Sequence, residues 1–360
     1  MPMLAEQPEK SRLTELVDIV IGVDTHADTH TAAVVTATTG AVLATMTVSS
    51  DAEGYTELVE FAELQSGLRA WAIEGTGGYG AGLARHLADL DELVVELDRP
   101  GRPARRAGAK SDPLDAARAA REALSRTRLA QPKTGKDRAA LQMLVTVRRG
   151  AVEACGDAQR QLRALVITAP EQVRDRFRGQ STAEMVATGA RLRPCSAAAD
   201  VEVFTALSML KTLARRIVAL QTEAAAHQDT IREIVRSWRP DLLPLPGVGP
   251  LTAAAVLTAW SHPGRCRDDG AFAMLAGTAP IPASSGKTVR YRLNRSGDRQ
   301  LNRALHTIAV SRLRYDPDTR AYAQRRRAEG KTDAEIRRCL KRYITRQLFR
   351  QLEHSSASAA

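Results

Sequence analysis

The sequence lacks the features that mark membrane, secreted and zinc-finger proteins. It has no run of about 18 consecutive apolar residues, which argues against a membrane span. Its N-terminus lacks a basic stretch followed by an apolar one, so we expect no secretory signal and a cytoplasmic location. The cysteines are scattered, with no Cys-x-x-Cys pair, which argues against a disulfide framework and a zinc finger.

Aromatic residues are also scarce, and acidic residues are scarce in one part of the chain. At 4%, the aromatic content is too low for base stacking to be the main means of binding nucleic acid. The net charge of +11 is uneven, because residues 1–110 carry 9 basic and 17 acidic side chains and the rest carries 43 and 24. This imbalance predicts that the C-terminal two thirds bind a polyanion.

The first part of the chain has the pattern of a mixed-sheet α/β domain. Residues 18–49 contain three β-rich segments in succession, and helical and strand patterns alternate after them. The further strands are expected at 70–75 and 92–98, with helices at 51–64 and 78–90. A last helix begins at Ser111 and Asp112, so we expect one domain over 18–130.

The middle and the end of the chain are predicted to be mostly helical. Long helical patterns cover 137–168 and 198–238, and Pro170 separates them. These helices could pair as a coiled-coil-like arm that mediates oligomerisation, or form a plain helical domain. The predicted regions are a helical linker over 137–238 and a mostly α-helical C-terminal domain over 240–350.

The C-terminal domain begins with "LPLPGVGPLTAAAVL", which resembles a helix-hairpin-helix element of DNA-binding proteins. Gly247 and Gly249 would let backbone amides approach a phosphate, and the following helix would add its dipole. The alternative is a tight turn between helices. With the basic surplus, we favour DNA contact.

Acidic residues occur at strand ends and at one helix start in the first domain. Asp24 and Glu74 end apolar strands, where an ionised carboxylate needs a cation or a partner. Asp112 and Asp115 could be capping residues, with Asp112 as the N-cap and Asp115 at the third helical position. Alternatively, all four acids could hold a pair of hard cations, Mg²⁺ or Mn²⁺, about 4 Å apart.

Other candidate ligands in the same stretch are given less weight. The pair His26 and His30 follows a strand and lacks the helical spacing of a zinc site, so we do not expect zinc. Asp28 is expected to face the solvent.

The segment 275–306, "LAGTAPIPASSGKTVRYRLNRSGDRQLNRALH", combines serines with many arginines. By composition Ser284 and Ser285 lie in a loop, and the arginines form a solvated or phosphate-binding face. No Gly-x-Ser-x-Gly motif marks a hydrolase.

Taken together, these motifs resemble the DEDD transposases of insertion sequences, a family that also includes the Piv-type DNA invertases. The resemblance rests on the order of "GVDTHADTHTAAVV", "EGTGGYGAGLARHL", "RPGRPARRAGAKSDPLDAARAA", "LPGVGPLTAAAVL" and "LAGTAPIPASSGK", and it covers about 18–345. The family often has Lys where this chain has Ala27 and Gly where it has Ala109.

The resemblance implies a RuvC-like, RNase H-type first domain in which Asp24, Glu74, Asp112 and Asp115 are the catalytic, metal-binding tetrad. It implies that Ser285, with Ser284 as the nearest alternative, attacks a DNA phosphate and becomes covalently linked to the strand. The implied partners are donor and target DNA, a structured guide (bridge) RNA and further copies of the chain in a dimer or tetramer. The implied location is the nucleoid of a bacterial cytoplasm.

The residues expected to contact nucleic acid are two glycines and a set of basic side chains. They are Gly247, Gly249, Lys287, Arg290, Arg292, Arg295, Arg299, Arg303, Arg102, Arg105, Arg106 and Lys110.

Two other functions stay open. A junction-resolving nuclease would use the same acids with water as the nucleophile, and a non-catalytic DNA-binding protein would need only the basic residues. An actin-like sugar kinase is disfavoured. Its first phosphate loop resembles "GVDTHADTHTAAVV", but no later Asp-Gly-Gly-Thr phosphate loop follows in this sequence.

Overall fold

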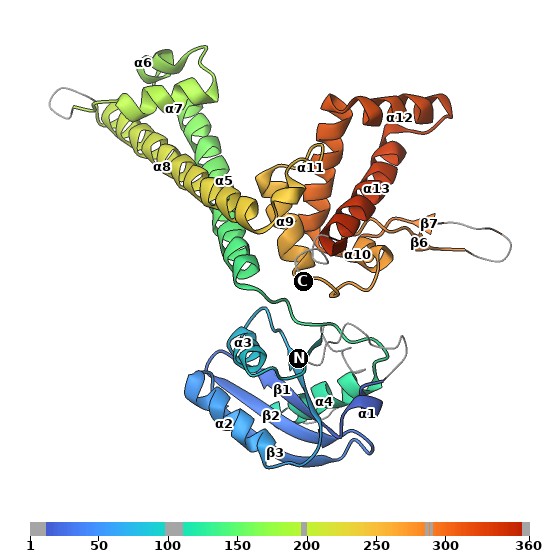
Figure 1. The fold of residues 1–360 in the computed structure, drawn as a ribbon. Coiled ribbons are helices and arrows are strands. Elements are labelled where there is room, and N and C mark those ends of the chain that lie inside the picture. The colour runs from blue at the N-terminus through green and yellow to red at the C-terminus, as the bar shows by residue number, and fades with distance from the viewer. Residues whose placement is uncertain (1–11, 98–110, 196–199, 285–287, 289–290, 355–360) are drawn as a thin grey trace. The chain divides into compact units, whose positions relative to one another are not determined.

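The computed structural model describes residues 12–97, 111–195, 200–284, 288 and 291–354 (Figure 1). The chain divides into two compact units, Met1–Thr134 and Gly135–Ala360.

The first unit is built on a five-stranded mixed sheet. The strands are β1 (Ile19–Thr25), β2 (Thr29–Thr36), β3 (Val42–Ser49), β4 (Arg69–Glu74) and β5 (Val94–Leu97), in the spatial order β3-β2-β1-β4-β5. The pairs β1–β2 and β2–β3 are antiparallel, whereas β1–β4 and β4–β5 are parallel. The predicted mixed-sheet α/β domain is confirmed, and its topology fits an RNase H-like fold.

Helices cover both faces of this sheet, because side chains alternate along each strand and both faces are apolar. Ile21 and Ile73 share one core with α2 (Ala52–Glu63) and α3 (Ala81–Asp89). Val20 and Ala72 share a second core with α4 (Asp112–Ser125) and with the short α1 (Leu13–Leu16). The sheet therefore separates the α2/α3 side from the α4 side.

The second unit begins with two long helices that lie side by side, α5 (Lys136–Thr168) and α8 (Val201–Trp238) (Figure 1). They confirm the two predicted helical stretches. The short elements α6 (Glu171–Arg174), η2 (Asp175–Phe177) and α7 (Thr182–Arg191) pack at one end of the pair, around Phe177 and Leu210. No helix in the described ranges is both long and apolar enough to cross a membrane.

The rest of the second unit packs around one apolar core. Its helical elements are η3 (Pro240–Leu242), α9 (Pro250–Trp260), α10 (Asp269–Leu275), α11 (Arg299–Tyr315), α12 (Pro317–Ala328) and α13 (Asp333–His354). Leu257 of α9 shares a core with Ile308 of α11 and Leu348 of α13. The same core includes Leu141 of α5 and Ile231 of α8, so the long helices are anchored in it.

A short hairpin interrupts the helices between α10 and α11. Its strands are β6 (Ile281–Pro282) and β7 (Tyr291–Arg292), which pair antiparallel. The sequence predicted a loop here, since strands of two residues are too short to show an alternating pattern.

Candidate functional site

Gly22 lets helix α4 lie directly on strand β1. A Cβ atom at Gly22 would lie 2.0 Å from the Ala116 carbonyl oxygen and 2.6 Å from the Ala120 amide nitrogen. Both are backbone atoms, so movement of a side chain could not make room for a larger residue. The close approach fixes α4 on the sheet and brings its first turn to the end of β1.

Asp24 is the penultimate residue of β1, and strand alternation places it on the same face as Gly22, toward α4. Its side chain is 18% exposed. Burial raises the pKa of Asp24; His26 opposes this rise, and the charges of Asp115 and Asp112 add to it. Three carboxyl groups are therefore close enough to repel one another, and a bound cation would relieve that repulsion.

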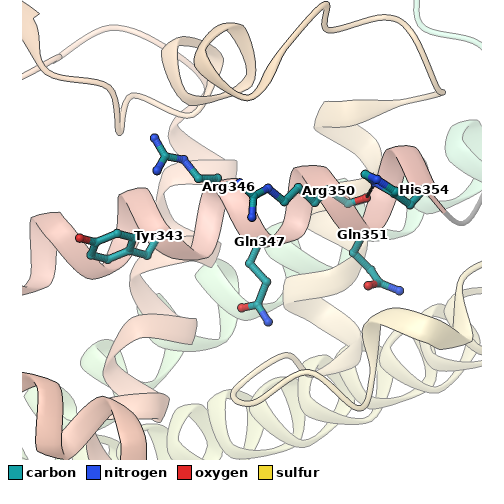
Figure 2. Close-up of a pocket in the computed structure, with 6 residues that line it drawn as sticks. All are labelled: Tyr343, Arg346, Gln347, Arg350, Gln351 and His354. Atoms are coloured by element: carbon teal, nitrogen blue, oxygen red, sulfur yellow. Dashed lines mark hydrogen bonds between the residues drawn. The ribbon is translucent and has the colours of Figure 1, made fainter.

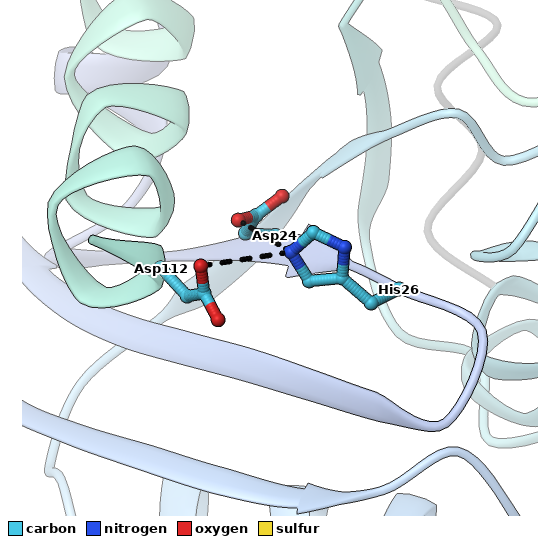
Figure 3. A group of neighbouring side chains, drawn as sticks. All are labelled: Asp24, His26 and Asp112. Carbon is cyan, nitrogen blue, oxygen red and sulfur yellow. Dashed lines mark ion pairs between the residues drawn. The ribbon is translucent and has the colours of Figure 1, made fainter. Parts of the chain in front are cut away.

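His26 lies between Asp24 and Asp112 (Figure 3). Its Nε2 atom is 3.3 Å from Asp24 Oδ2 and 3.7 Å from Asp112 Oδ1. The residue follows β1 directly, and its amide donates to the Thr29 carbonyl oxygen at 3.0 Å, which closes the turn into β2. Ligand atoms of Asp24, His26 and Asp112 all lie within 4.8 Å of one another.

Asp112 is the first residue of α4 and not its N-cap. Ser111 is the N-cap, and its own side chain makes no capping hydrogen bond. The capping interpretation of Asp112 is therefore wrong, because the Ser111 carbonyl accepts the Asp115 amide at 3.1 Å and the Asp112 carboxylate faces His26. This half-exposed carboxylate is available to a ligand.

Asp115 lies one turn further along α4. Its carboxylate accepts a hydrogen bond from Arg118 Nη1 at 2.6 Å, and the Asp115 side chain is 26% exposed. The guanidinium orients Asp115, whose charge acts on Asp24 across the gap between helix and strand.

Glu74 ends β4, the parallel neighbour of β1. Val23 pairs with Ile73, so Glu74 follows in register beside Asp24 and, by alternation, on the α4 side of the sheet. Thr25 Oγ1 donates to the Glu74 carbonyl oxygen at 3.1 Å and joins the two strand ends.

The donor set in this region fits a divalent cation. Carboxylate oxygens bind Mg²⁺ and Mn²⁺, and an imidazole nitrogen adds a ligand that transition metals accept. The raised pKa of Asp24 has the physical cause expected of a cation site, since burial and two neighbouring acids disfavour its ionised form.

A basic cavity lies beside the β6–β7 hairpin in the second unit. Its volume is about 660 Å³, and Ser284, two residues after β6, is exposed on this hairpin. Six cationic side chains line the cavity: Arg292, Arg295, Arg338, Lys341, Arg342 and Arg346. Their number predicts an anionic ligand.

Hydrogen bonds hold three of the cationic side chains that line this cavity, those of Lys341, Arg342 and Arg346. Lys341 Nζ donates to Asn302 Oδ1 at 2.5 Å, and burial lowers the pKa of Lys341. Asp269 accepts hydrogen bonds from Arg346 Nε at 2.6 Å and Arg342 Nη2 at 3.2 Å. Asp269 pairs with two of the six cationic side chains that line the cavity, so the cavity keeps a positive surplus.

One face of α13 lines a second hollow, of about 520 Å³ (Figure 2). Its residues recur at three- and four-residue spacing along the helix: Tyr343, Arg346, Gln347, Arg350, Gln351 and His354. Arg312 Nη1 donates to Gln347 Oε1 at 2.9 Å, and Gln351 Nε2 donates to Asp241 Oδ2 at 3.0 Å. This face offers amides and guanidinium groups, which bind phosphate oxygens.

The Pro-Gly-Val-Gly-Pro loop forms a turn that packs on α11. Gly247 has a φ of +74°, and a Cβ there would lie 2.9 Å from the Ile308 carbonyl oxygen. Arg312 Nε donates to the Pro246 carbonyl oxygen at 2.7 Å, and the Gly249 amide donates to Thr252 Oγ1 at 2.9 Å. These contacts fit the interhelical-turn interpretation, and phosphate contact stays a prediction.

Comparison with known proteins identifies the family. Residues 21–169 match a family model for the DEDD transposase of IS110, described as a transposase. Residues 240–324 match the model of the transposase IS116/IS110/IS902 family. The chain belongs to the IS110 family of transposases.

Two relatives are insertion-element proteins. The IS900 uncharacterized 42 kDa protein of Mycobacterium paratuberculosis is 27% identical over 315 residues, which cover 72% of this chain and 77% of that protein. The IS110 uncharacterized 43.6 kDa protein of Streptomyces coelicolor is 31% identical over 147 residues, which cover 40% of this chain and 36% of that protein.

Membership of the IS110 family supports DNA transposase activity, with DNA as a partner and a divalent metal as a cofactor. The first family model spans Asp24, Glu74, Asp112 and Asp115, and the second spans the basic hairpin. The predicted family resemblance is thus confirmed.

Some of the residues predicted to contact nucleic acid lie in the described part of the chain, and others lie outside it. Arg292 and Arg295 line the basic cavity, and Arg299 and Arg303 are exposed on α11. Seven other predicted site residues lie outside the described residues: Ser285, Lys287, Arg290, Arg102, Arg105, Arg106 and Lys110.

The sequence pattern did not single out His26 as a candidate metal ligand beside the acids. Its position two residues after Asp24 was the available signal, but a histidine in a turn has no periodicity to mark its direction. His30, considered together with it, is buried on the opposite sheet face, where it stacks on Tyr55 with 5.6 Å between ring centroids. Asp28 is exposed, as predicted.

Proposed function

We propose that this transposase cuts and rejoins DNA strands with a metal centre held by Asp24, Glu74, Asp112 and Asp115 and with Ser285 as the nucleophile. The proximity of Asp24 to Asp112 and Asp115 carries the proposal. These acids are far apart in the sequence, and their mutual repulsion would weaken the fold unless a ligand used them.

The acids have distinct tasks in this proposal. Asp24, the most buried of Asp24, Asp112 and Asp115, would hold the ion from the end of β1, and Asp112 and Asp115 would bind it from α4. Arg118 keeps the Asp115 carboxylate in one orientation. When bound, the cation would stabilise charge on the phosphate oxygens and help to deprotonate the attacking hydroxyl.

In the proposed reaction, Ser285 replaces a deoxyribose oxygen in the ester bond to a DNA phosphate. Its Oγ forms a bond to phosphorus, the bond from phosphorus to one deoxyribose oxygen breaks, and the serine proton passes to a base while the departing oxygen gains a proton. The phosphoserine ester keeps the energy of the broken linkage. A hydroxyl of another strand can then attack it and release the serine, so no nucleotide cofactor is needed.

The basic side chains of the second unit would hold the nucleic acids. The cavity that includes Arg292 and Arg295 lies beside the hairpin that leads to Ser285, which fits a site for the phosphates that flank the cut. The face of α13 offers a second strip for a backbone. Donor DNA, target DNA and a guide RNA are the proposed ligands, at the nucleoid of a bacterial cytoplasm.

Strand exchange between two duplexes requires several cuts, so we propose a dimer or tetramer. Exposed apolar side chains on α5 and α8 support these helices as the contact surface: Met143, Val147, Val152, Met209 and Val218.

The test is metal-dependent strand cleavage of supercoiled DNA that carries the ends of the element, with its transcribed RNA. The parent chain and Ser284→Ala should give a covalent protein–DNA adduct that survives denaturation, and Ser285→Ala should give neither adduct nor cut. Cleavage by Ser285→Ala would indicate a nuclease that uses water. DNA binding without any cleavage by the parent would indicate a non-catalytic protein.

A further inference from the structure

His26 points its Nε2 atom at two of the four carboxylates of the proposed metal centre, those of Asp24 and Asp112 (Figure 3). Two ligands of one ion, each about 2.1 Å from it, lie about 3.0–3.4 Å apart. The 3.3 Å between His26 Nε2 and Asp24 Oδ2 already matches this spacing, and the 3.7 Å to Asp112 Oδ1 exceeds it by a few tenths of an ångström.

The backbone holds His26 in this place. The hydrogen bond from its amide to Thr29 closes the turn, and Thr25 pairs with His30 on the two flanking strands. The imidazole is half exposed, so core packing does not explain its direction.

We propose that His26 is a nitrogen ligand of the metal and that it makes the centre favour transition metals such as Mn²⁺ and Co²⁺ over Mg²⁺. This inference rests on the proposed metal centre and adds one ligand of a different chemical kind. Mg²⁺ takes oxygen ligands, whereas an imidazole nitrogen adds affinity for transition metals.

The choice of ion follows from the donor set. With carboxylates alone, Mg²⁺ and Mn²⁺ would compete on nearly equal terms, and the more abundant ion would be bound. A single nitrogen donor shifts that balance, because the hydrated Mg²⁺ ion gains little from exchanging a water for an imidazole.

The test is direct metal binding by the full chain, without a reaction. Pulsed electron paramagnetic resonance of bound Mn²⁺ reports a directly coordinated ¹⁴N nucleus, and titration gives the Mn²⁺ and Mg²⁺ dissociation constants. The variants are His26→Ala, the matched control Asp28→Ala in the same exposed turn, and Asp24→Asn. Circular dichroism checks that each variant folds.

We expect a ¹⁴N coupling in the parent and in Asp28→Ala that disappears in His26→Ala and returns on addition of free imidazole. Mn²⁺ affinity should fall about tenfold or more in His26→Ala, the size of effect seen when support of a metal site is removed, while Mg²⁺ affinity changes much less.

If Mn²⁺ binding depends on Asp24 but bound Mn²⁺ shows no ¹⁴N coupling, the inference is overturned and the proposed metal centre still stands. His26 would then be only an ion-pair partner of the acids. A ¹⁴N coupling that survives in His26→Ala would also overturn it. Metal binding unaffected by Asp24→Asn would refute the proposed metal centre itself, and the role of His26 with it.

Discussion

Replacing Gly22 by alanine should damage the first unit and its acidic site together. The new Cβ would lie 2.0 Å from one backbone atom of α4 and 2.6 Å from another. Contacts of this kind rarely fall below about 3 Å, so α4 must retreat by about 1 Å. Added volume in a packed core costs about 1–3 kcal/mol, and the rigid backbone on both sides places this variant at the upper end.

The same shift would move Asp112 and Asp115 away from Asp24. A displacement of about 1 Å at a reacting centre can reduce the rate by about 100-fold. We therefore expect Gly22→Ala to lose about 3 kcal/mol of stability and about 100-fold of strand-cleavage activity.

Hydrogen exchange of peptides from β1 and α4, with urea denaturation of the full chain, measures the stability. Gly150→Ala is the matched control, since nothing lies within 4 Å of a Cβ at Gly150 within α5. It should be neutral or stabilising by up to about 1 kcal/mol. Adding Ala120→Gly should not rescue Gly22→Ala, because the closest atom is the Ala116 backbone oxygen. Unchanged stability and activity in Gly22→Ala would show that α4 does not need to lie against Gly22.

Three further predictions concern charge and assembly. Asp115→Asn should abolish strand exchange without destabilising the metal-free fold, because it removes repulsion; full activity by this variant would reduce Asp115 to a structural role. Asp24→Asn and Ser285→Ala, each inactive alone, should recover activity when mixed if subunits share a site, and inactive mixed oligomers would contradict sharing. Burial raises the pKa of Glu92, but hydrogen bonds from Arg69 and Trp71 outweigh it and hold that pKa below its usual value. Stability from Glu92 is therefore present at neutral pH and lost as the pH falls below about 4.5, and Glu92→Gln should flatten that part of the acid-denaturation profile; an unchanged profile would contradict it.

The sheet and two of its acids could be predicted because each strand is a short apolar or β-branched run with clear ends. Asp24 and Glu74 stand out as charges at the ends of such runs. Their meeting with Asp112 depends on the approach of α4 over Gly22. A glycine inside a strand has no distinctive pattern, so its role as the contact point became visible only in three dimensions.

The remaining features could not be predicted because the sequence does not show the direction of a side chain or the presence of very short elements. Asp112 fits an N-cap pattern, yet the helix begins one residue earlier than that pattern predicts and its carboxylate faces His26. The β6–β7 hairpin is too short for periodicity, and its base depends on a glycine. Gly277 has a φ of +63°, and a Cβ there would lie 2.7 Å from the Ser296 carbonyl oxygen. The cationic cavity likewise joins side chains from separate elements.

Anomalous diffraction from crystals of the full chain grown with Mn²⁺ would locate the ion directly. We expect a peak about 2.2 Å from carboxylate oxygens of both Asp24 and Asp112, with Glu74, Asp115 and His26 as further ligands of one or two ions. A fully occupied Mn²⁺ elsewhere in the chain, with Asp24 and Asp112 still paired only to His26, would contradict the proposed metal centre.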